Sequence, residues 1–350
     1  MRIGLLTTSF PRHAGDYAGS FVGDRVRQLL ADGHTVDVVA AGDGRIAREP
    51  EDDRLTVTRV APLAQQEAGL FYGDGAPEAL ERGGARVWLA AAHFSCALAA
   101  AARALSDRFD IIESHWLVPS ALAALAAAPS HRQRAFAHSG DVALLERVPL
   151  GRTIARRLAR AGIAIHFVSD ALRSRFAALA GAPVGIVDVL APTPGAWSPR
   201  SGVDVAGRAR LGLARPTVLA VGRLVPIKGH ERLLRACARV QASGALAAGA
   251  LEVVILGDGP ERTRLGDLAN QLGVRLRLPG FVPREDVGRW LRAADVFVQP
   301  SIRLANGRTE GAPFATAEAL AVGIPVLVEN DVGRLARGLA RRFHPTATGV

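Results

Sequence analysis

Residues 217–241 read TVLAVGRLVPIKGHERLLRACARVQ. The first six form a continuous apolar strand pattern, the loop after them carries Arg223 and Lys228, and helical spacing of apolar residues begins near His230. A buried strand that leads through a short loop into a helix is the repeating unit of a parallel sheet covered by helices. This stretch therefore indicates an α/β protein.

The same unit recurs along most of the chain. Further apolar strand patterns, most of them followed by helical segments, lie at residues 2–8, 35–42, 110–115, 134–141, 164–169, 251–257, 295–301 and 324–328. Residues 191–201, APTPGAWSPRS, are rich in proline and separate two series of strands, so they are the best linker candidate. We predict two Rossmann-like, doubly wound domains, residues 1–191 and 202–350, whose sheets face a cleft.

Composition narrows the possible partners. The 350 residues carry a formal net charge of +10 and 5% aromatic residues but no block of like charges, which disfavours nucleic-acid binding. Cys96 and Cys237 are far apart without metal-ligand spacing, which suits a reducing cytoplasm. The N-terminal MRIGLLTTSF is typical of a buried strand and not of a signal peptide. The apolar stretch 87–105 is mostly alanine, so we expect a buried helix in a soluble, cytoplasmic protein.

Lys228 is the only lysine among 43 Lys and Arg residues. Together with Arg223 it would flank the amides of a helix N-terminus, a place that attracts anions. An arginine can bind two phosphate oxygens at once, whereas the compact lysine ammonium can contact a leaving phosphate from one side. The pattern fits a diphosphate site. The alternative is a solvated loop with two ordinary charges.

A second candidate segment is EGAPFATAEALAVGIPVLV, residues 310–328. Glu310 lies just before a helix expected from about Pro313, and Glu318 lies inside that helix. The first carboxylate could accept hydrogen bonds from sugar hydroxyls, and the second could accept a pair from a ribose diol. The alternative is a surface charge followed by an ordinary helix-face residue.

The motif G-R-x4-K-G, followed about eighty residues later by E-x7-E, resembles the family 4 retaining nucleotide-sugar glycosyltransferases, which have the GT-B fold. Six other stretches are similar to that family: SFPRHAGDYAGSFV (9–22), ADGHTVDVVAAG (31–42), SHWLVPSALAALAA (114–127), AHSGDVALL (137–145), ILGDGPERTRLGDLANQLG (255–273) and LPGFVPREDVGRWLRAADVFVQPS (278–301). The resemblance covers nearly the whole chain up to about residue 330.

The resemblance implies roles for residues of the second domain. Arg223 and Lys228 would hold the donor diphosphate, with Lys228 stabilising the departing nucleotide. Glu318 would bind the donor ribose. The other implied donor contacts are Gly257, Gly259, Glu310, Gly311, Ala312, Pro313 and Phe314.

In the first domain, the resemblance implies that the loop with Gly15, Asp16 and Gly19 lies beside the donor phosphates and the acceptor. His138 would lie near the reacting sugar, and Asp141, which follows it in the same loop, would belong to the acceptor and phosphate site. The catalytic set would be Arg223, Lys228, Glu310 and His138. His115, in SHW, is a weaker candidate that we expect to be a core residue.

The implied activity is transfer of a sugar from a nucleotide-sugar donor to a glycan or lipid-linked acceptor, in cell-envelope or exopolysaccharide synthesis. Cleavage of the sugar–phosphate bond builds negative charge on the diphosphate, so preorganised cations favour the transition state. No acidic cluster with metal-ligand spacing is visible, and we expect a metal-independent reaction without a cofactor.

Two other functions remain open. A nucleotide-sugar epimerase shares the architecture, although the E-x7-E spacing disfavours it. An inactive, truncated remnant that binds nucleotide sugar is the non-enzymatic alternative. A dinucleotide-binding oxidoreductase is disfavoured because GDGPER lacks the third glycine of the Rossmann fingerprint.

A basic helix is predicted at GRTIARRLARAGIAI, residues 151–165. It brings together Arg152, Arg156, Arg157 and Arg160, which could dock on an anionic membrane where lipid-linked acceptors lie. The alternative is a solvated helix face.

Two segments depart from the family pattern. APTPGAWSP (191–199) stands where the family has P-x-G-V-D, and RLARGLARRFHPTATGV (334–350) stands where it has G-x-P-E and D-G-x-T-G. We find neither helix nor strand periodicity in the second segment, which has four arginines and no carboxylate. Our hypothesis is that the reading frame changes near Gly333 and leaves the second domain truncated or divergent after about residue 330, which sequencing the gene would decide.

Overall fold

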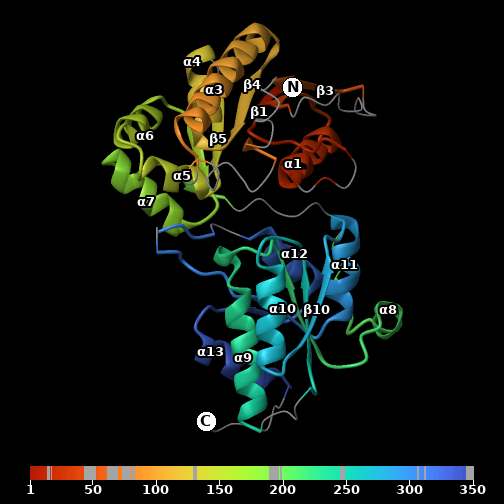
Figure 1. Cartoon of the computed structure of the whole chain (residues 1–350). Coiled ribbons are helices and arrows are strands. Elements are labelled where there is room, and N and C mark those ends of the chain that lie inside the picture. Colours follow the sequence, from red (N-terminus) through yellow and green to blue (C-terminus); the bar gives the residue numbers. More distant parts are fainter. Residues whose placement is uncertain are drawn as a thin grey trace. The chain divides into compact units, whose positions relative to one another are not determined.

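The computed structural model describes the chain except residues 14–15, 17, 43–52, 61–69, 73–79, 81–82, 129–131, 189–196, 198, 245–248, 306, 311–312 and 344–350. Two compact units, Met1–Leu190 and Ala191–Val350, are each built on their own parallel sheet (Figure 1). The expected α/β class and the two doubly wound sheets are confirmed. A common cleft between the sheets stays a prediction.

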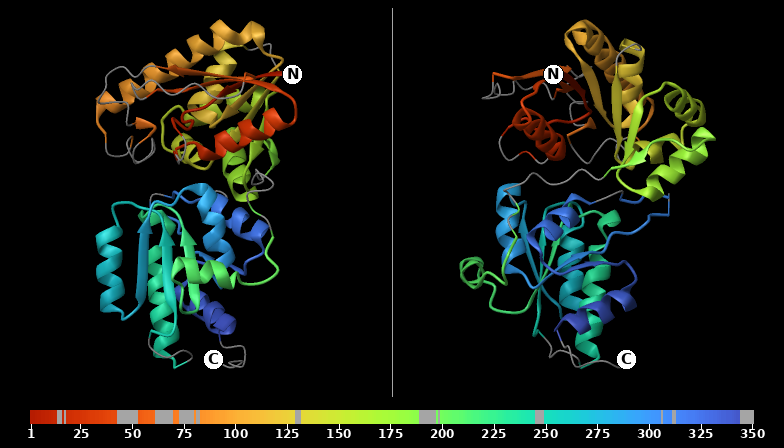
Figure 2. Two further views of the ribbon diagram at one scale, coloured as in Figure 1. Left: turned by 90° about the vertical axis from the view of Figure 1, so that its right-hand side faces the viewer. Right: turned by 180° about the vertical axis from the view of Figure 1, so that it is seen from behind.

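The first unit contains a seven-stranded sheet in the order β3-β2-β1-β4-β5-β6-β7, parallel throughout. Its strands are β1 (Arg2–Leu6), β2 (Thr35–Ala41), β3 (Leu55–Val60), β4 (Ile111–His115), β5 (Gln133–Ala137), β6 (Ala164–Phe167) and β7 (Ile186–Val187). Helices cover both faces (Figure 2), so the central strands are apolar on both sides.

The helices of the first unit are α1 (Ser20–Ala31), α3 (Ala85–Leu105), α4 (Leu122–Ala127), α5 (Gly140–Leu145), α6 (Gly151–Arg160) and α7 (Asp170–Ala180). Helix α1 packs Val22, Val26 and Leu29 against one face of the sheet. Helices α3 and α4 pack against the other face.

Helix α3 is less buried than we expected. Ala90, Phe94, Leu98 and Ala102 form a buried stripe at four-residue spacing, but only 22% of its apolar stretch is buried. By length and composition it is the one helix within the described ranges that could cross a membrane. The buried stripe nevertheless indicates that α3 packs on the sheet as one of its covering helices.

The second unit contains five parallel strands in the order β10-β9-β8-β11-β12. They are β8 (Thr217–Val221), β9 (Glu252–Leu256), β10 (Arg275–Gly280), β11 (Val296–Gln299) and β12 (Val326–Val328). The helices are α8 (Val205–Leu211), α9 (His230–Ala242), α10 (Arg262–Gln271), α11 (Arg284–Ala293), α12 (Phe314–Val322) and α13 (Val332–Phe343). Helices α9, α10 and α13 pack on one face, and α11 and α12 on the other.

Helix α13 corrects our interpretation of the C-terminal segment. We found no periodicity after residue 333, yet Leu335, Ala336 and Leu339 form a buried stripe that packs with α9 in the core. The arginines of this segment occupy the rest of the helix surface, and their number obscured the apolar spacing. The proposed change of reading frame stays a hypothesis.

The end of the predicted linker belongs to the second unit. Trp197 is buried among residues of α11 and α12. The backbone N–H of Arg200 donates to the Val322 carbonyl at 2.9 Å, and Arg200 Nη1 donates to the carbonyls of Arg292 and Ala294 at 3.1 and 2.6 Å. Arg200 therefore ties the incoming chain to the ends of two helices.

Each sheet has a point where the strand order reverses. In the first unit β1 lies between β2 and β4, and in the second unit β8 lies between β9 and β11. Ligands of doubly wound sheets bind beyond the carboxyl ends of the strands at such points. The loops after β1, β4, β5, β8 and β11 are therefore the places to examine.

Candidate active site

The predicted diphosphate loop follows β8. A short 3₁₀ turn, Pro226–Lys228, leads through Gly229 into α9. Gly229 has φ 66°, and a Cβ there would lie 2.1 Å from the Pro300 carbonyl oxygen, so only glycine fits. The Ile302 N–H donates to the Ile227 carbonyl at 2.9 Å and joins this loop to the segment after β11.

Lys228 and Glu310 meet at this point. The Lys228 Nζ lies 2.5 Å from Glu310 Oε1, and the two side chains are 17% and 18% exposed. Glu310 Oε2 also accepts hydrogen bonds from Gln299 Nε2 at 3.1 Å and from the Ser301 hydroxyl. The structure therefore brings two predicted site residues together and holds the carboxylate with polar groups from the end of β11.

The loop after β9 supports the diphosphate loop through its backbone. Leu224 N–H donates to the Asp258 carbonyl at 2.9 Å. A Cβ on Gly257 would lie 2.1 Å from the Gly222 carbonyl oxygen, and one on Gly259 would lie 2.6 Å from that of Leu224. Both glycines therefore permit close backbone packing next to Arg223, and their contact with the donor stays a prediction.

Glu318 is bound by an arginine that the sequence did not indicate. Glu318 is buried in α12, its Oε1 accepts a hydrogen bond from Arg284 Nε at 2.8 Å, and Arg284 Nη2 lies 2.6 Å from the same oxygen as an ion pair. Burial raises the pKa of Glu318, and the charge of Arg284 opposes that shift. The Arg284 guanidinium also lies over the Trp197 ring, 5.6 Å from its centroid. This packing fixes the carboxylate that we expected at the donor ribose.

The start of α12 agrees with the expected helix N-terminus. Pro313 is the N-cap, and the helix begins at Phe314. Thr316 N–H donates to the Pro313 carbonyl at 3.0 Å. Gly311 and Ala312 lie outside the described residues.

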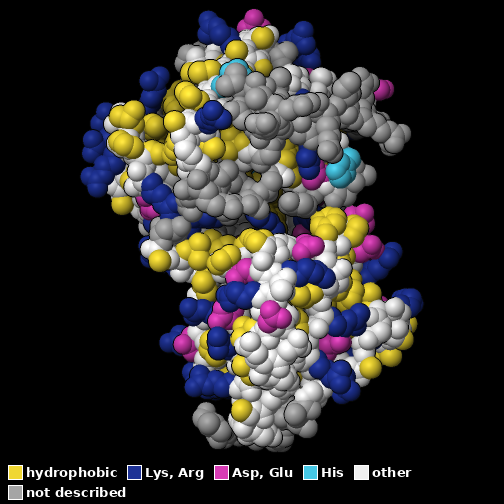
Figure 3. Space-filling model, viewed as in Figure 1, with side chains coloured by type: hydrophobic (Ala, Val, Ile, Leu, Met, Phe, Trp, Pro, Cys, Tyr) yellow, Lys and Arg dark blue, Asp and Glu magenta, His cyan; other side chains and the backbone are white. Residues whose placement is uncertain are grey.

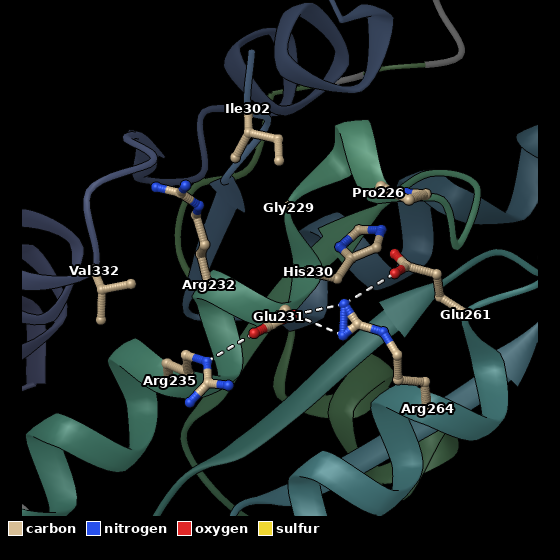
Figure 4. A pocket seen from close by; sticks show the side chains of 10 residues that line it. All are labelled: Pro226, Gly229, His230, Glu231, Arg232, Arg235, Glu261, Arg264, Ile302 and Val332. Carbon is tan, nitrogen blue, oxygen red and sulfur yellow. Dashed lines mark hydrogen bonds and ion pairs between the residues drawn. The ribbon is translucent and has the colours of Figure 1, made fainter. Parts of the chain in front are cut away.

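A pocket of about 460 Å³ lies beside the diphosphate loop (Figure 4). Its lining is Pro226, Gly229, His230, Glu231, Arg232, Arg235, Glu261, Arg264, Ile302 and Val332. Arg264 binds Glu231 at 2.5 Å and Glu261 at 3.2 Å, and Arg235 binds Glu231 at 2.8 Å. These pairs neutralise much of the lining charge, and the lining includes neither Lys228 nor Glu310.

In the first unit, His138 follows β5 and lies against aromatic rings. Its ring centroid is 4.7 Å from that of Phe21 and 4.9 Å from that of Trp116. His138 Nε2 is 3.1 Å from Nδ1 of His115, which is fully buried as we expected of a core residue. Desolvation, with a smaller contribution from His115, places the pKa of His138 well below its ordinary value. His138 is therefore a neutral imidazole near pH 7.

Asp141 holds the loops after β4 and β5 together. Its carboxylate accepts hydrogen bonds from the backbone N–H groups of Leu117 at 2.7 Å, Val142 at 2.9 Å and His138 at 3.2 Å. Burial raises the pKa of Asp141 to about 6, although these hydrogen bonds favour the ionised form. We expected this residue near the acceptor, and in the structure its oxygens are occupied by backbone donors.

The loop after β1 is closed by Asp16. Its Oδ2 accepts from Arg12 Nε at 2.6 Å, and its Oδ1 accepts from the Ala18 N–H at 3.1 Å. Gly19 has φ 69°, and a Cβ there would lie 2.3 Å from the Ser9 carbonyl oxygen. Gly15 lies outside the described residues. Asp16 and Gly19 thus shape the loop that leads into α1.

Several polar residues of these sites escaped the sequence analysis. In the second unit they are Arg284, Gln299 and Ser301, and in the first unit they are Glu113, whose Oε1 lies 3.3 Å from His115 Nε2, and its partner Arg25. Glu113 offered a signal, because it is a carboxylate inside the apolar strand pattern DIIESH. Among the described residues, no group of three or more His, Cys, Asp or Glu side chains is arranged to hold a metal ion.

Solved structures with the same fold cover nearly the whole chain. The trehalose-6-phosphate synthase OtsA has a TM-score of 0.73 at 14% identity, covering 99% of this chain and 92% of that one. A sucrose-phosphate synthase from Thermosynechococcus elongatus has a TM-score of 0.69 at 17% identity, covering 97% and 89%. Two parallel-sheet α/β units with these neighbours define the GT-B fold, as expected.

Residues 208–340 match the family described as Glycosyl transferases group 1. The GDP-mannose-dependent alpha-(1-6)-phosphatidylinositol monomannoside mannosyltransferase of Mycobacterium tuberculosis is 34% identical over 236 residues, which are 63% of this chain and 59% of that protein. The putative colanic acid biosynthesis glycosyltransferase WcaL of Escherichia coli is 39% identical over 112 residues, 31% of this chain and 27% of that protein. The matches thus span less than two thirds of these relatives.

Proposed function

We propose that this protein is a retaining glycosyltransferase that moves a hexose from a nucleotide-sugar donor to a glycan or lipid-linked acceptor, in cell-envelope or exopolysaccharide synthesis. The observation that carries the proposal is the Lys228–Glu310 pair at the carboxyl ends of β8 and β11. It lies inside the region that matches the glycosyltransferase family. The mannosyltransferase and WcaL are both transferases by name, which adds no support to an epimerase.

The proposed reaction breaks the bond between the anomeric carbon and the diphosphate oxygen. The bonding electrons pass to that oxygen, and the ammonium of Lys228 binds the resulting charge more tightly than it binds the ground state. The acceptor hydroxyl forms the new bond to the anomeric carbon, and its proton passes to the departing diphosphate oxygen. The cation at the leaving group is supplied by the protein itself, which supports a reaction without a metal ion.

Glu310 would hold hydroxyls of the donor sugar. Gln299 and Ser301 orient its Oε2, so a sugar hydroxyl that enters meets a carboxylate already in position. When the donor binds, the Lys228 ammonium would move from Glu310 Oε1 to the donor phosphate, and a sugar hydroxyl would donate to the freed Oε1.

We also propose that α6 contacts anionic lipid. Arg152, Arg156, Arg157 and Arg160 are exposed on this helix, and basic side chains gather over it in Figure 3. Gly151, Ala155 and Leu158 on its other side are buried, so the arginines face solvent. Such a surface suits an enzyme whose acceptor is lipid-linked and whose place is the inner face of the cell membrane.

A turnover assay tests the proposed function. The purified chain is incubated with a panel of GDP- and UDP-sugars and with lipid extract or oligosaccharide as acceptor, and transferred sugar and free nucleotide are measured. Transfer that disappears in Lys228→Ala supports the proposal. Release of nucleotide without acceptor would indicate an epimerase, and calorimetric donor binding without turnover would indicate a binding remnant.

A further inference from the structure

Glu113 is a buried charge that the proposed reaction has not used. It lies in β4, is fully buried, and its Oε1 and Oε2 accept from Arg25 Nε and Nη2 at 2.8 and 3.0 Å. Arg134 Nε lies 3.4 Å from Oε2. A charge in a sheet's interior costs free energy even when it is paired, so its presence near the loops after β4 and β5 calls for a reason.

A chain of hydrogen bonds runs from this carboxylate to His138. Glu113 Oε1 is 3.3 Å from His115 Nε2, and His115 Nδ1 is 3.1 Å from His138 Nε2. The rings of His115 and His138 are stacked at 5.3 Å, and His115 also stacks on Phe136 at 5.1 Å. The three side chains are therefore held in one arrangement by packing.

The ionised carboxylate determines where each proton lies. Burial opposes ionisation of Glu113, but its hydrogen bonds to His115 and Arg25 lower its pKa to about 2, so it only accepts. His115 must then donate through Nε2. Arg25 and Arg134 already pair with that carboxylate, and a neutral His115 that donates through Nε2 leaves its Nδ1 as an acceptor. That acceptor requires a proton on Nε2 of His138.

We propose that Glu113 is a positioning residue which, through a neutral His115, fixes His138 as the Nε2-protonated tautomer, so that the remaining nitrogen of His138, Nδ1, acts as a hydrogen-bond acceptor for a hydroxyl of the sugar substrate. This assignment of the partner rests on the proposed function. A neutral imidazole presented as an acceptor binds a hydroxyl donor and does not bind a phosphate oxygen. His138 would thus select and orient sugar, while the diphosphate is bound by the second unit.

The tautomer can be measured without any activity. Long-range ¹H–¹⁵N correlation spectra of protein labelled with ¹⁵N-histidine distinguish a protonated ring nitrogen from an unprotonated one, and His115→Phe and His138→Ala assign the two rings. We expect protonated Nε2 on both rings in the wild-type protein. In His115→Phe, which keeps the stack on Phe136, we expect His138 to become a mixture of tautomers.

His166 provides a matched control. It stacks on the same Phe136 at 4.7 Å, but its Nδ1 contacts Asp188 at 2.9 Å, a carboxylate outside the chain of hydrogen bonds from Glu113. His166→Phe should leave the His138 spectrum unchanged. A wild-type His138 protonated on Nδ1, or the same single tautomer in His115→Phe, would overturn the proposal.

Kinetics provide an independent measurement once a donor is found. Glu113→Gln should lower kcat by about 10-fold or more, as is typical when a supporting hydrogen bond is removed. If Glu113 acts through His138, Glu113→Gln should not lower kcat any further in a protein that already carries His138→Ala. If Glu113 has a purely structural role, Glu113→Gln should lower kcat by the same factor in the wild-type protein and in His138→Ala. An additive result would refute the positioning role. Absence of turnover with every donor would refute the proposed function, and the spectra would still decide the tautomer.

Discussion

Lys228 is held by one carboxylate and lies directly over the backbone of Gly222. A Cβ on Gly222 would approach the Lys228 side chain to 2.8 Å, so the lysine stem runs across the glycine. The space between Gly222 and Glu310 therefore suits the compact ammonium of a lysine better than the wider, planar guanidinium of an arginine. The structure thus supports a physical reason why the chain has kept a lysine at this position alone.

We expect Lys228→Arg to lower kcat by about 100-fold, although the positive charge is retained, because the guanidinium cannot occupy the same place at the leaving phosphate. Initial rates of nucleotide release with saturating donor would measure the change. Arg235→Lys, in the exposed pair with Glu231, is the reverse substitution nearby and should keep wild-type rates. Wild-type kcat in Lys228→Arg would show that only charge matters.

The pairing of Glu113 predicts how stability depends on pH. Its folded-state pKa of about 2 is below the ordinary value of 4.5, so its contribution is complete above pH 4.5 and is lost as the pH falls toward 2. The difference corresponds to about 3 kcal/mol of unfolding free energy. Glu113→Gln should lack this acid dependence and already be less stable at pH 7. Urea unfolding at pH 7, 4 and 3 measures both, and parallel curves for the two proteins would contradict the prediction.

Single helices carry two further predictions. Helix α13 contributes Leu335 and Leu339 to the core that it shares with α9. Leu339→Ala should therefore lower the free energy of unfolding by about 2–5 kcal/mol, because a buried cavity replaces the side chain. Arg341→Ala on the exposed side of the same helix should change it by less than about 0.5 kcal/mol. Equal effects in the two variants would mean that α13 does not pack as described.

Helix α6 predicts a salt-dependent attraction to membranes. Replacing Arg152, Arg156, Arg157 and Arg160 by serine removes four exposed charges without touching the buried side of the helix. Near an anionic surface each is worth about 1 kcal/mol. When phosphatidylglycerol vesicles are sedimented at low salt, the wild-type protein should be found with the vesicles in the pellet and the variant in the supernatant. Neutral phosphatidylcholine vesicles are the control, and binding unaffected by the substitutions or by salt would dismiss the proposal.

The whole chain consists of two units with separate cores, and this predicts how a donor affects unfolding. A nucleotide sugar at 100 times its Kd should stabilise the folded state by about 2.7 kcal/mol through mass action. We expect scanning calorimetry to show this shift in the same transition that Leu339→Ala lowers, because both belong to residues 191–350. No shift with any nucleotide sugar, or a shift in a transition insensitive to Leu339→Ala, would contradict the placement of the donor.

Much of this fold was predictable because central parallel strands are apolar on both sides. Such strands, β1, β8 and β9 among them, leave continuous apolar runs in the sequence, and these runs also place the loops that follow them. The edge strands β3, β7 and β10 were missed for the same reason, whereas the edge strand β12 was predicted. Strand β10 alternates arginine with leucine at Arg275–Gly280 and is only half covered, so it has no such run. Helix α13 was missed because arginine dominates its composition.

The sequence by itself determined the α/β class, the two series of strands, and the candidate loops with Lys228, Glu310 and His138, since each depends on neighbours within a few residues. The tertiary structure alone decided which side chains meet. Arg25 and Glu113 are 88 residues apart, and Arg284 and Glu318 are 34 apart. Contacts of this kind arise because the loops after parallel strands meet at the same edge of a sheet and helices cover the sheet. A local sequence pattern does not indicate which distant residues this arrangement brings into contact.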